Sequence, residues 1–253
     1  MQPPESATNT PDPAAVEPVD DARLLIRGSQ HILYDSRRIS TPDGRLFEPA
    51  ADATTKQAGR HTVHFVKIEG RQYVLRHYWR GGQAAKLSRD GYLWQGIERS
   101  RPFREWRLLA ALQQRGLPVP RPAAARVTRT GLLLYRGDIL VEYLPDTRTL
   151  AELAARQPLP ASLWGRIGAT IHRFHRAGAW HADLNASNIL IDAQERIFLI
   201  DWDRGMLRRP APGWRRANLA RLARSLAKFA GKEAVFHYSE NDWQALLLGY
   251  TRG

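Results

Sequence analysis

The most constraining stretch of this sequence is residues 180–205, which read WHADLNASNILIDAQERIFLIDWDRG. Within it, Asp183 is followed five residues later by Asn188, and Asp201 ends an apolar run. We expect residues 189–200 to form a short β-hairpin, because two apolar runs flank the turn residues between them. Such a hairpin returns the chain to its starting point, so Asp201 would lie beside Asn188.

Side chains with oxygen atoms that converge in this way fit phosphoryl transfer. That reaction needs a carboxylate near the attacking hydroxyl group, together with oxygen ligands for a magnesium ion that bridges the nucleotide phosphates. Asn188 and Asp201 would face one such cation. A lone Asp or Asn is common as a turn cap. Here His181 and Asp183 stand in register with the other two residues, and apolar strands follow, so we interpret the stretch as catalytic.

The chain before residue 141 predicts an acidic tail and a β-rich lobe. Residues 1–22 contain five prolines and five acidic residues, a composition typical of disorder. In residues 23–140, aromatic and branched side chains alternate with polar ones on both sides of Glu69 and Gly70, which predicts a hairpin of residues 61–79. Further strands are predicted at residues 30–34, 119–127 and 132–143, the last interrupted at residues 136–138.

Two features of this hairpin suit nucleotide phosphates. Gly59 precedes it, where a small residue would let backbone N–H groups approach a phosphate, although the start of an ordinary strand explains one glycine equally well. Arg76 on the second strand would supply a cation. It is a planar guanidinium group at a position where a lysine is usual. Lys67 and Lys86 are rivals for that role, and a solvated cation on an exposed sheet is the alternative.

A helix is predicted for residues 102–114 by its apolar spacing and by the stop signals that follow it. Glu105 falls on the apolar face of this helix. A carboxylate in apolar surroundings requires a cationic partner. We therefore expect Glu105 to pair with Arg76.

Residues 141–253 are predicted to form a mostly helical lobe. The run 140–144 would connect the two lobes, and the backbone at Glu142 and Leu144 could hydrogen-bond adenine, although an apolar run of this kind also suits a core strand. Leu163, Ile167, Ile171 and Phe174 mark a helix that leads into the catalytic stretch. A basic, turn-rich segment at 208–216 precedes two further predicted helices, at residues 218–229 and 241–250.

The charge of the chain indicates an anionic partner. The net charge is +13, and 33 of the 38 basic residues are arginine, which grips phosphate and carboxylate with two hydrogen bonds. A biased base composition of the genome would also raise the arginine content. A nucleic acid, a membrane surface or a phosphorylated substrate would each fit, but no nucleic-acid-binding motif is present. Without cysteine the chain forms no disulfide, and no run approaches the roughly 18 apolar residues of a membrane span.

Taken together, these motifs resemble the 3-deoxy-D-manno-octulosonic acid (Kdo) kinases. That family is related to the lipopolysaccharide core heptose kinases within the protein-kinase-like superfamily. The combination is more specific than the catalytic stretch alone, which aminoglycoside kinases and RIO-type kinases also carry. The matching pieces lie between residues of about 60 and 226, and they are residues 74–82, Glu105, 119–122, 181–185, 188–190 and 200–205.

The resemblance implies an α+β, bilobal protein-kinase-like fold: an antiparallel β-sheet lobe with one main helix, then a mostly helical lobe. By position, Asp183 would be the catalytic base, Asn188 and Asp201 would bind Mg²⁺, and Arg76 with Glu105 would position the phosphates of ATP. His181 would order the loop. Asp203 would be either a second metal ligand or the partner of an arginine.

The resemblance also implies a substrate and a place in the cell. The γ-phosphoryl group of ATP would pass to the 4-hydroxyl group of Kdo on a lipid A precursor, during synthesis of the lipopolysaccharide inner core. This would occur at the cytoplasmic face of the bacterial inner membrane, with the enzyme bound peripherally. The surplus of positive charge agrees with an anionic membrane surface and an anionic glycolipid, and no nucleic-acid partner is expected.

Two alternatives remain open. A heptose kinase of the same superfamily would share the catalytic geometry and differ in the acceptor pocket. A pseudokinase scaffold that binds anionic glycolipid without catalysis would explain the single glycine and Arg76, whereas the intact Asp183, Asn188 and Asp201 count against it.

Overall fold

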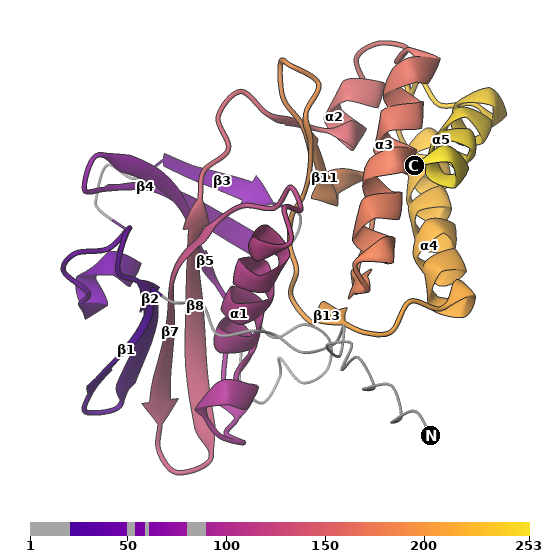
Figure 1. The fold of residues 1–253 in the computed structure, drawn as a ribbon. Helices are drawn as coiled ribbons and strands as arrows, with labels where there is room; N and C mark the ends of the chain where they lie inside the picture. The colour runs from indigo at the N-terminus through magenta and orange to yellow at the C-terminus, as the bar shows by residue number, and fades with distance from the viewer. Residues whose placement is uncertain (1–20, 50–53, 59–60, 80–89) are drawn as a thin grey trace, which may run out of the picture.

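The computed structural model describes residues 21–49, 54–58, 61–79 and 90–253. Two lobes lie side by side, an N-terminal one built on a sheet and a C-terminal one built mostly from helices (Figure 1). Residues 1–20 of the tail predicted for residues 1–22 lie outside the described residues, as do Gly59 and Lys86, whereas Ala22 begins β1.

The N-terminal lobe is an antiparallel sheet with one main helix, α1 (Arg101–Gln114). The strand order is β1-β2-β7-β8-β5-β4-β3, with the short β6 paired to β8. The strands are β1 (Ala22–Arg27), β2 (Gln30–Asp35), β3 (Thr54–Ala58), β4 (His61–Ile68), β5 (Arg71–His77), β6 (Tyr92–Leu93), β7 (Pro122–Thr130) and β8 (Leu134–Glu142).

The C-terminal lobe contains the helices α2 (Leu150–Ala154), α3 (Ala161–Arg176), α4 (Pro212–Ala230) and α5 (Glu240–Arg252). Its strands are short: β9 (Arg148–Thr149), β10 (Ala179–Trp180), β11 (Ile189–Ile191), β12 (Ile197–Leu199) and β13 (Met206–Leu207). Helices α3 and α5 pack closely, because Gly168 and Gly249 lack side chains where each helix meets the backbone of the other.

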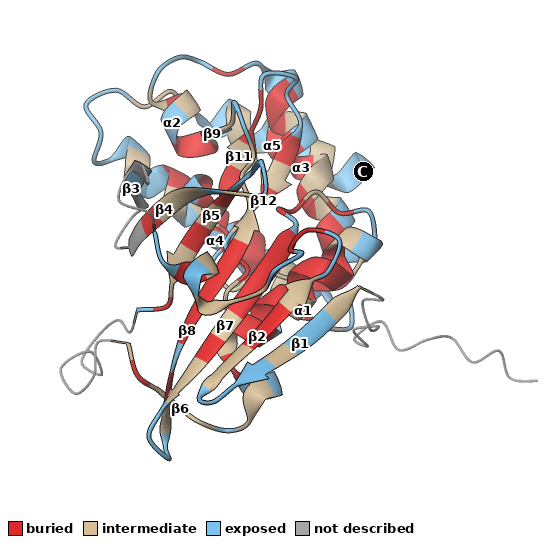
Figure 2. Ribbon diagram, turned by 90° about the vertical axis from the view of Figure 1, so that its left-hand side faces the viewer, coloured by how far each residue is buried: buried red, intermediate tan, exposed pale blue. Residues whose placement is uncertain are grey.

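Two apolar cores lie on opposite faces of the sheet. The larger core joins α1 to the C-terminal lobe and contains the buried rings of Trp106, Trp164 and Trp202. The smaller core, with Tyr73 and Leu75 of β5, lies on the sheet face away from α1. Figure 2 shows the buried strands in the middle of the sheet.

Most of the elements predicted from the sequence are present. The hairpin β4–β5 turns at Glu69 and Gly70, which both have positive φ (48° and 79°), as a tight two-residue hairpin turn requires. The fold class is also as predicted, with an antiparallel β-sheet lobe, one main helix and a mostly helical second lobe.

Several boundaries were predicted wrongly. Residues 140–142 of the predicted connector 140–144 belong to β8. Strand β8 runs without interruption through residues 136–138, because Gly137 leaves the space that Pro102 at the start of α1 fills. Strand β7 begins at Pro122, three residues later than expected. Helix α4 begins at Pro212, so much of the segment predicted as turn is helical, since proline is well tolerated in the first helical turn.

Candidate active site

The predicted hairpin of residues 189–200 forms and brings the catalytic stretch together. Strands β11 and β12 pair in antiparallel register, and the Ile200 N–H donates to the Asn188 carbonyl oxygen at 3.0 Å. Asn188 and Asp201 therefore both lie at the open end of this hairpin, one before its first strand and one after its second. Asp201 has a φ of 62°, an unusual backbone conformation for a non-glycine residue.

His181 is buried and holds the loop from inside. Its Nδ1 accepts the Asp183 N–H at 3.1 Å, so Nε2 carries the proton and donates to the Ile200 carbonyl oxygen at 2.9 Å. Burial lowers the pKa of His181, which keeps the ring neutral and this pattern intact. The geometry fits an ordering role, because both ring nitrogens are engaged with the backbone.

The Asp183 carboxylate is half exposed, so a substrate in solution could reach it. Its two oxygens are oriented by different neighbours: Oδ1 accepts from Arg221 Nη1 at 2.9 Å, and Oδ2 accepts from Asn185 Nδ2 at 3.1 Å. The Asn188 side-chain amide donates to the Asp183 carbonyl oxygen at 2.9 Å. That donation leaves Asn188 Oδ1, the kind of hard oxygen ligand that magnesium binds.

Arg76 lies between two carboxylates, as its predicted pairing with Glu105 requires. Its Nη2 contacts both oxygens of Glu105 at 2.5 Å, and its Nη1 donates to Asp201. Tyr78 also donates its hydroxyl group to Glu105, at 2.5 Å. Lys67 is not part of this cluster; it lines a cavity beside the connector.

The charge states of this cluster follow from its burial. The Glu105 side chain is 3% exposed. Burial alone would lower the pKa of Arg76, but Glu105 and Asp201 raise it well above its ordinary value, so the guanidinium stays charged. Burial and Glu105 raise the pKa of Tyr78, so its hydroxyl group remains a donor. The cluster therefore presents a fixed cation next to Asp201.

Asp203 is an arginine partner. Arg101, the first residue of α1, donates from Nε to Asp203 Oδ1 at 2.9 Å and makes a second contact through Nη2. Arg101 also donates to the Tyr92 hydroxyl group at 2.6 Å. These bonds tie the loop after Asp201 to the start of the helix that carries Glu105, so the two lobes are linked next to the site.

One face of α4 holds the catalytic loop, and the sequence analysis missed it. Asn218 brackets His181, accepting its N–H at 3.3 Å and donating to its carbonyl oxygen at 2.9 Å. Ser225 Oγ accepts the Ala186 N–H at 3.2 Å. Together with Arg221, these residues follow helical spacing. Polar residues at positions 218, 221 and 225, interleaved with buried leucines, were the available signal.

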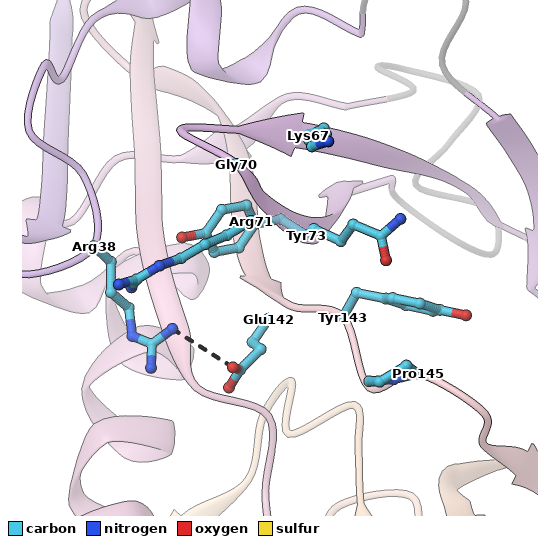
Figure 3. A pocket seen from close by; sticks show the side chains of 9 residues that line it. Arg38, Lys67, Gly70, Arg71, Tyr73, Glu142, Tyr143 and Pro145 are labelled. Carbon is cyan, nitrogen blue, oxygen red and sulfur yellow. Dashed lines mark ion pairs between the residues drawn. The ribbon is translucent and has the colours of Figure 1, made fainter.

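The connector joins β8 to the C-terminal lobe beside a cavity of about 390 Å³ (Figure 3). Glu142 lines this cavity, and its carboxylate lies 3.7 Å from Arg38. Its N–H donates to the Arg121 carbonyl oxygen at 2.8 Å, and the Tyr143 N–H donates to Gln72 at 3.1 Å. The Leu144 carbonyl oxygen accepts from Thr147. Arg76 and Asp201 do not line the cavity.

The described residues contain no cluster of three or more His, Cys, Asp or Glu side chains that could hold a metal ion without help. A magnesium ion in a phosphotransferase takes many of its ligands from nucleotide phosphates and water. Asn188 and Asp201 supply one amide and one carboxylate oxygen, which is the donor set such an ion needs. Their chemistry fits, and they would share the ion with the nucleotide.

Comparison with known proteins gives consistent matches. A family model described as "Lipopolysaccharide kinase (Kdo/WaaP) family" matches residues 47–250. A 3-deoxy-D-manno-octulosonic acid kinase of Stenotrophomonas maltophilia (strain R551-3) is 46% identical over 215 residues, covering 83% of this chain and 85% of the relative. A 3-deoxy-D-manno-octulosonic acid kinase of Xanthomonas campestris pv. campestris (strain B100) is also 46% identical, over 234 residues. That match covers 90% of this chain and 93% of the relative.

A solved structure supports the fold. The structure titled "WaaP in complex with acyl carrier protein" matches with a TM-score of 0.51 and 18% sequence identity, covering 83% of this chain and 86% of the other. At this identity the likeness concerns the fold alone. It agrees with the two-lobed arrangement in Figure 1.

Proposed function

Because the chain belongs to the lipopolysaccharide kinase (Kdo/WaaP) family, we propose that it is an ATP-dependent Kdo kinase of lipopolysaccharide core synthesis. The observation that carries this proposal is the 46% identity to Kdo kinases over 83–90% of the chain. The arrangement of Asp183, Asn188 and Asp201 supports it, since each has the side chain that phosphoryl transfer requires.

Asp183 acts as the catalytic base in this proposal. Its carboxylate takes the proton from the 4-hydroxyl group of Kdo, the hydroxyl oxygen bonds to the γ-phosphorus of ATP, and the bond to ADP breaks. Asn185 and Arg221 support the role, because they hold the two carboxylate oxygens in a fixed direction. Orientation of this kind can supply much of a rate enhancement.

Arg76 positions the nucleotide phosphates, and Glu105 positions Arg76. The guanidinium contacts Glu105 through Nη2, so Nη1 is aimed at the Asp201 side of the cluster. Asn188 and Asp201 hold Mg²⁺, which neutralises charge on the phosphates when it is bound. We assign adenine to the backbone at Glu142 and Leu144, and phosphate contacts to the backbone at Gly59, as the sequence pattern suggests.

The acceptor is a Kdo-bearing lipid A precursor, and the enzyme works at the cytoplasmic face of the bacterial inner membrane as a peripheral protein. None of the helices in the described part of the chain is long and apolar enough to cross a membrane. The net charge of +13 favours an anionic membrane surface and an anionic glycolipid over neutral partners. The proposal includes no nucleic-acid partner.

The test is transfer of labelled γ-phosphate from Mg²⁺-ATP to Kdo-bearing lipid A precursor, with a heptosylated acceptor in parallel. Label on the Kdo acceptor supports the proposal. Label only on the heptosylated acceptor would replace it with the heptose kinase alternative, and no label on either would favour the pseudokinase scaffold. Asp183→Ala should abolish this label. Glu195→Gln is its matched control and should keep the label, because Glu195 is a surface residue of the β11–β12 turn that pairs with Arg166.

A further inference from the structure

Three leucines at one end of the N-terminal sheet are exposed to an unusual degree. The turn between β7 and β8 carries Leu132 and Leu133, which are 84% and 72% exposed, and Leu93 of the adjacent β6 is 61% exposed. We call these three residues the apolar tip. Burial of one leucine side chain is worth about 1.5–3 kcal/mol. Turns are ordinarily built from polar residues or glycine, so the fold does not account for these side chains.

The backbone brings the three leucines together. Leu93 pairs with Leu134 across β6 and β8, and the Trp94 N–H donates to the Leu133 carbonyl oxygen at 2.8 Å. Gly131, with a φ of 75°, allows the turn. In Figure 2 the turn lies at the bottom of the view, at the end of β7 and β8, and it is coloured as exposed.

Three arginines lie on the strands at this end of the sheet. Arg27, the last residue of β1, is exposed, and the β1–β2 turn that follows it is bonded to β7, because the Arg129 N–H donates to the Ser29 carbonyl oxygen at 2.9 Å. Arg129 itself donates from Nη2 to the Leu132 carbonyl oxygen at 3.3 Å. The Arg136 side chain is half exposed, and its Nε forms an ion pair with Asp90 Oδ2 at 2.9 Å.

We propose that the apolar tip inserts into the surface of an anionic lipid bilayer while the neighbouring arginines contact lipid phosphates. Exposed apolar side chains with arginines nearby are the composition that binds such surfaces, since apolar burial and attraction to anionic headgroups add together. An acidic protein partner would explain the arginines, but it would not explain why leucines are exposed at a narrow turn. This assignment rests on the proposed function, in which the acceptor is carried on a lipid.

The position of the apolar tip suits that acceptor. Arg76 lies opposite Ile139 in the pairing of β5 with β8, and Leu133 precedes Ile139 by six residues in the chain. At about 3.4 Å per strand residue, the tip lies on the order of 20 Å from Arg76. The tip is at the end of the sheet away from the connector (Figure 1). A bilayer bound there leaves room for sugars to extend from the lipid into the site.

The absence of cysteine from the chain makes a direct test possible. A Leu133→Cys variant carries a polarity-sensitive fluorophore at the tip, and Leu248→Cys places the same fluorophore on α5, where Leu248 is 49% exposed. Vesicles of phosphatidylcholine with phosphatidylglycerol should shift the emission to shorter wavelength at position 133 only. Vesicles of phosphatidylcholine alone, or high salt, should reduce the shift.

Other outcomes overturn the proposal. Vesicle binding without a shift at position 133 would mean that another surface docks, and absence of vesicle binding would exclude a membrane role for the tip. A shift at position 133 that grows with protein concentration in the absence of vesicles would instead identify a second copy of the chain as the occupant.

A pair of double variants links the tip to catalysis. Leu132→Ser with Leu133→Ser should weaken binding to the anionic vesicles by at least about tenfold. Phosphorylation of a vesicle-embedded acceptor should fall in parallel, while the rate on a de-acylated, water-soluble acceptor stays unchanged. Val235→Ser with Leu248→Ser, which also removes exposed apolar side chains, should change neither. Equal losses on both acceptors would contradict the proposal.

This design separates the two proposals. If the unmodified chain phosphorylates no acceptor, the proposed function fails, yet the fluorophore at position 133 still reports whether the tip meets lipid. If transfer occurs on both acceptors and the tip variant behaves as the unmodified chain does on vesicles, only the docking surface is wrong.

Discussion

The catalytic loop and the cluster around Arg76 meet at Asp201, but different forces hold them. The loop is held by neutral hydrogen bonds that link His181, Asn185 and Asn188 to backbone atoms a few residues away, and by further bonds from α4. The Arg76 cluster is fixed by ion pairs between residues 29 and 125 positions apart in the sequence. The site thus combines a loop held largely by hydrogen bonds, which carries Asp183, with a long-range charge cluster around Arg76.

The largest expected effect comes from the loop. Asp183→Asn keeps the size of the side chain and removes the proton acceptor, so we expect kcat to fall by about 10³–10⁴-fold with little change in the KM for ATP. Steady-state transfer of labelled phosphate measures both constants. A parallel loss of ATP affinity would instead place Asp183 in the nucleotide site. The roles assigned separately to the loop and to the Arg76 cluster would then be wrong.

The next effect tests the charge cluster. Glu105→Gln leaves Arg76 without its buried partner, so kcat/KM for ATP should fall by about 100-fold, with a loss of stability of about 3–5 kcal/mol. Glu98→Gln is the matched control, since Glu98 pairs with Arg107 at 2.5 Å but is 54% exposed. Equal effects of the two substitutions would show that burial does not matter here. Thermal unfolding and ATP titrations supply the measurements.

Acid should weaken the C-terminal lobe through a histidine that lies outside the reaction. Burial, with Arg215 adding to it, lowers the pKa of His175 to about 4. In the unfolded chain this group titrates near 6.5, so the unfolded state binds more protons between pH 6.5 and 4, and stability is lost as pH falls through that window. We expect a loss of about 2 kcal/mol between pH 7 and 5 from urea unfolding. A His175→Gln variant should flatten this dependence, and an unchanged slope would assign it to other groups.

The smallest effect concerns the helix that supports the loop. Arg221→Gln removes one of the two side chains that orient the Asp183 carboxylate, so kcat should fall by about 10-fold while the protein stays folded. Arg224→Gln, one turn further along α4 and also exposed, should leave kcat unchanged. If both variants lose activity equally, the cause is the charge of the helix and not the contact at 2.9 Å between Arg221 and Asp183.

The difference between the two regions also explains what the sequence could predict. The hairpin that joins Asn188 to Asp201 was predictable, because its pairing is local and its strands are apolar. The pairing of Arg76 with Glu105 was predictable only because a carboxylate on an apolar helix face requires a cation. No local pattern could predict the hydrogen bond between Arg101 and Asp203, since that contact depends on how the two lobes meet.

Other features had a signal that was not used or had none. Helix α2 starts with a capping box of Thr149 and Glu152, a recognisable start pattern that the sequence analysis passed over. The uninterrupted course of β8 through Gly137 had no such signal, because glycine in a strand ordinarily marks a break. Only the packing of Pro102 of α1 against that glycine explains it.

The attachment of the catalytic loop to α4 has a consequence for synthesis of the protein. The residues that bond to His181, Asp183 and Ala186 lie 37–39 positions later in the chain. A ribosome therefore releases the catalytic loop well before it releases the helix that fixes the shape of that loop. We expect the nascent chain to stay inactive until α4 has emerged. The growing polypeptide would then consume no ATP before its C-terminal lobe can fold.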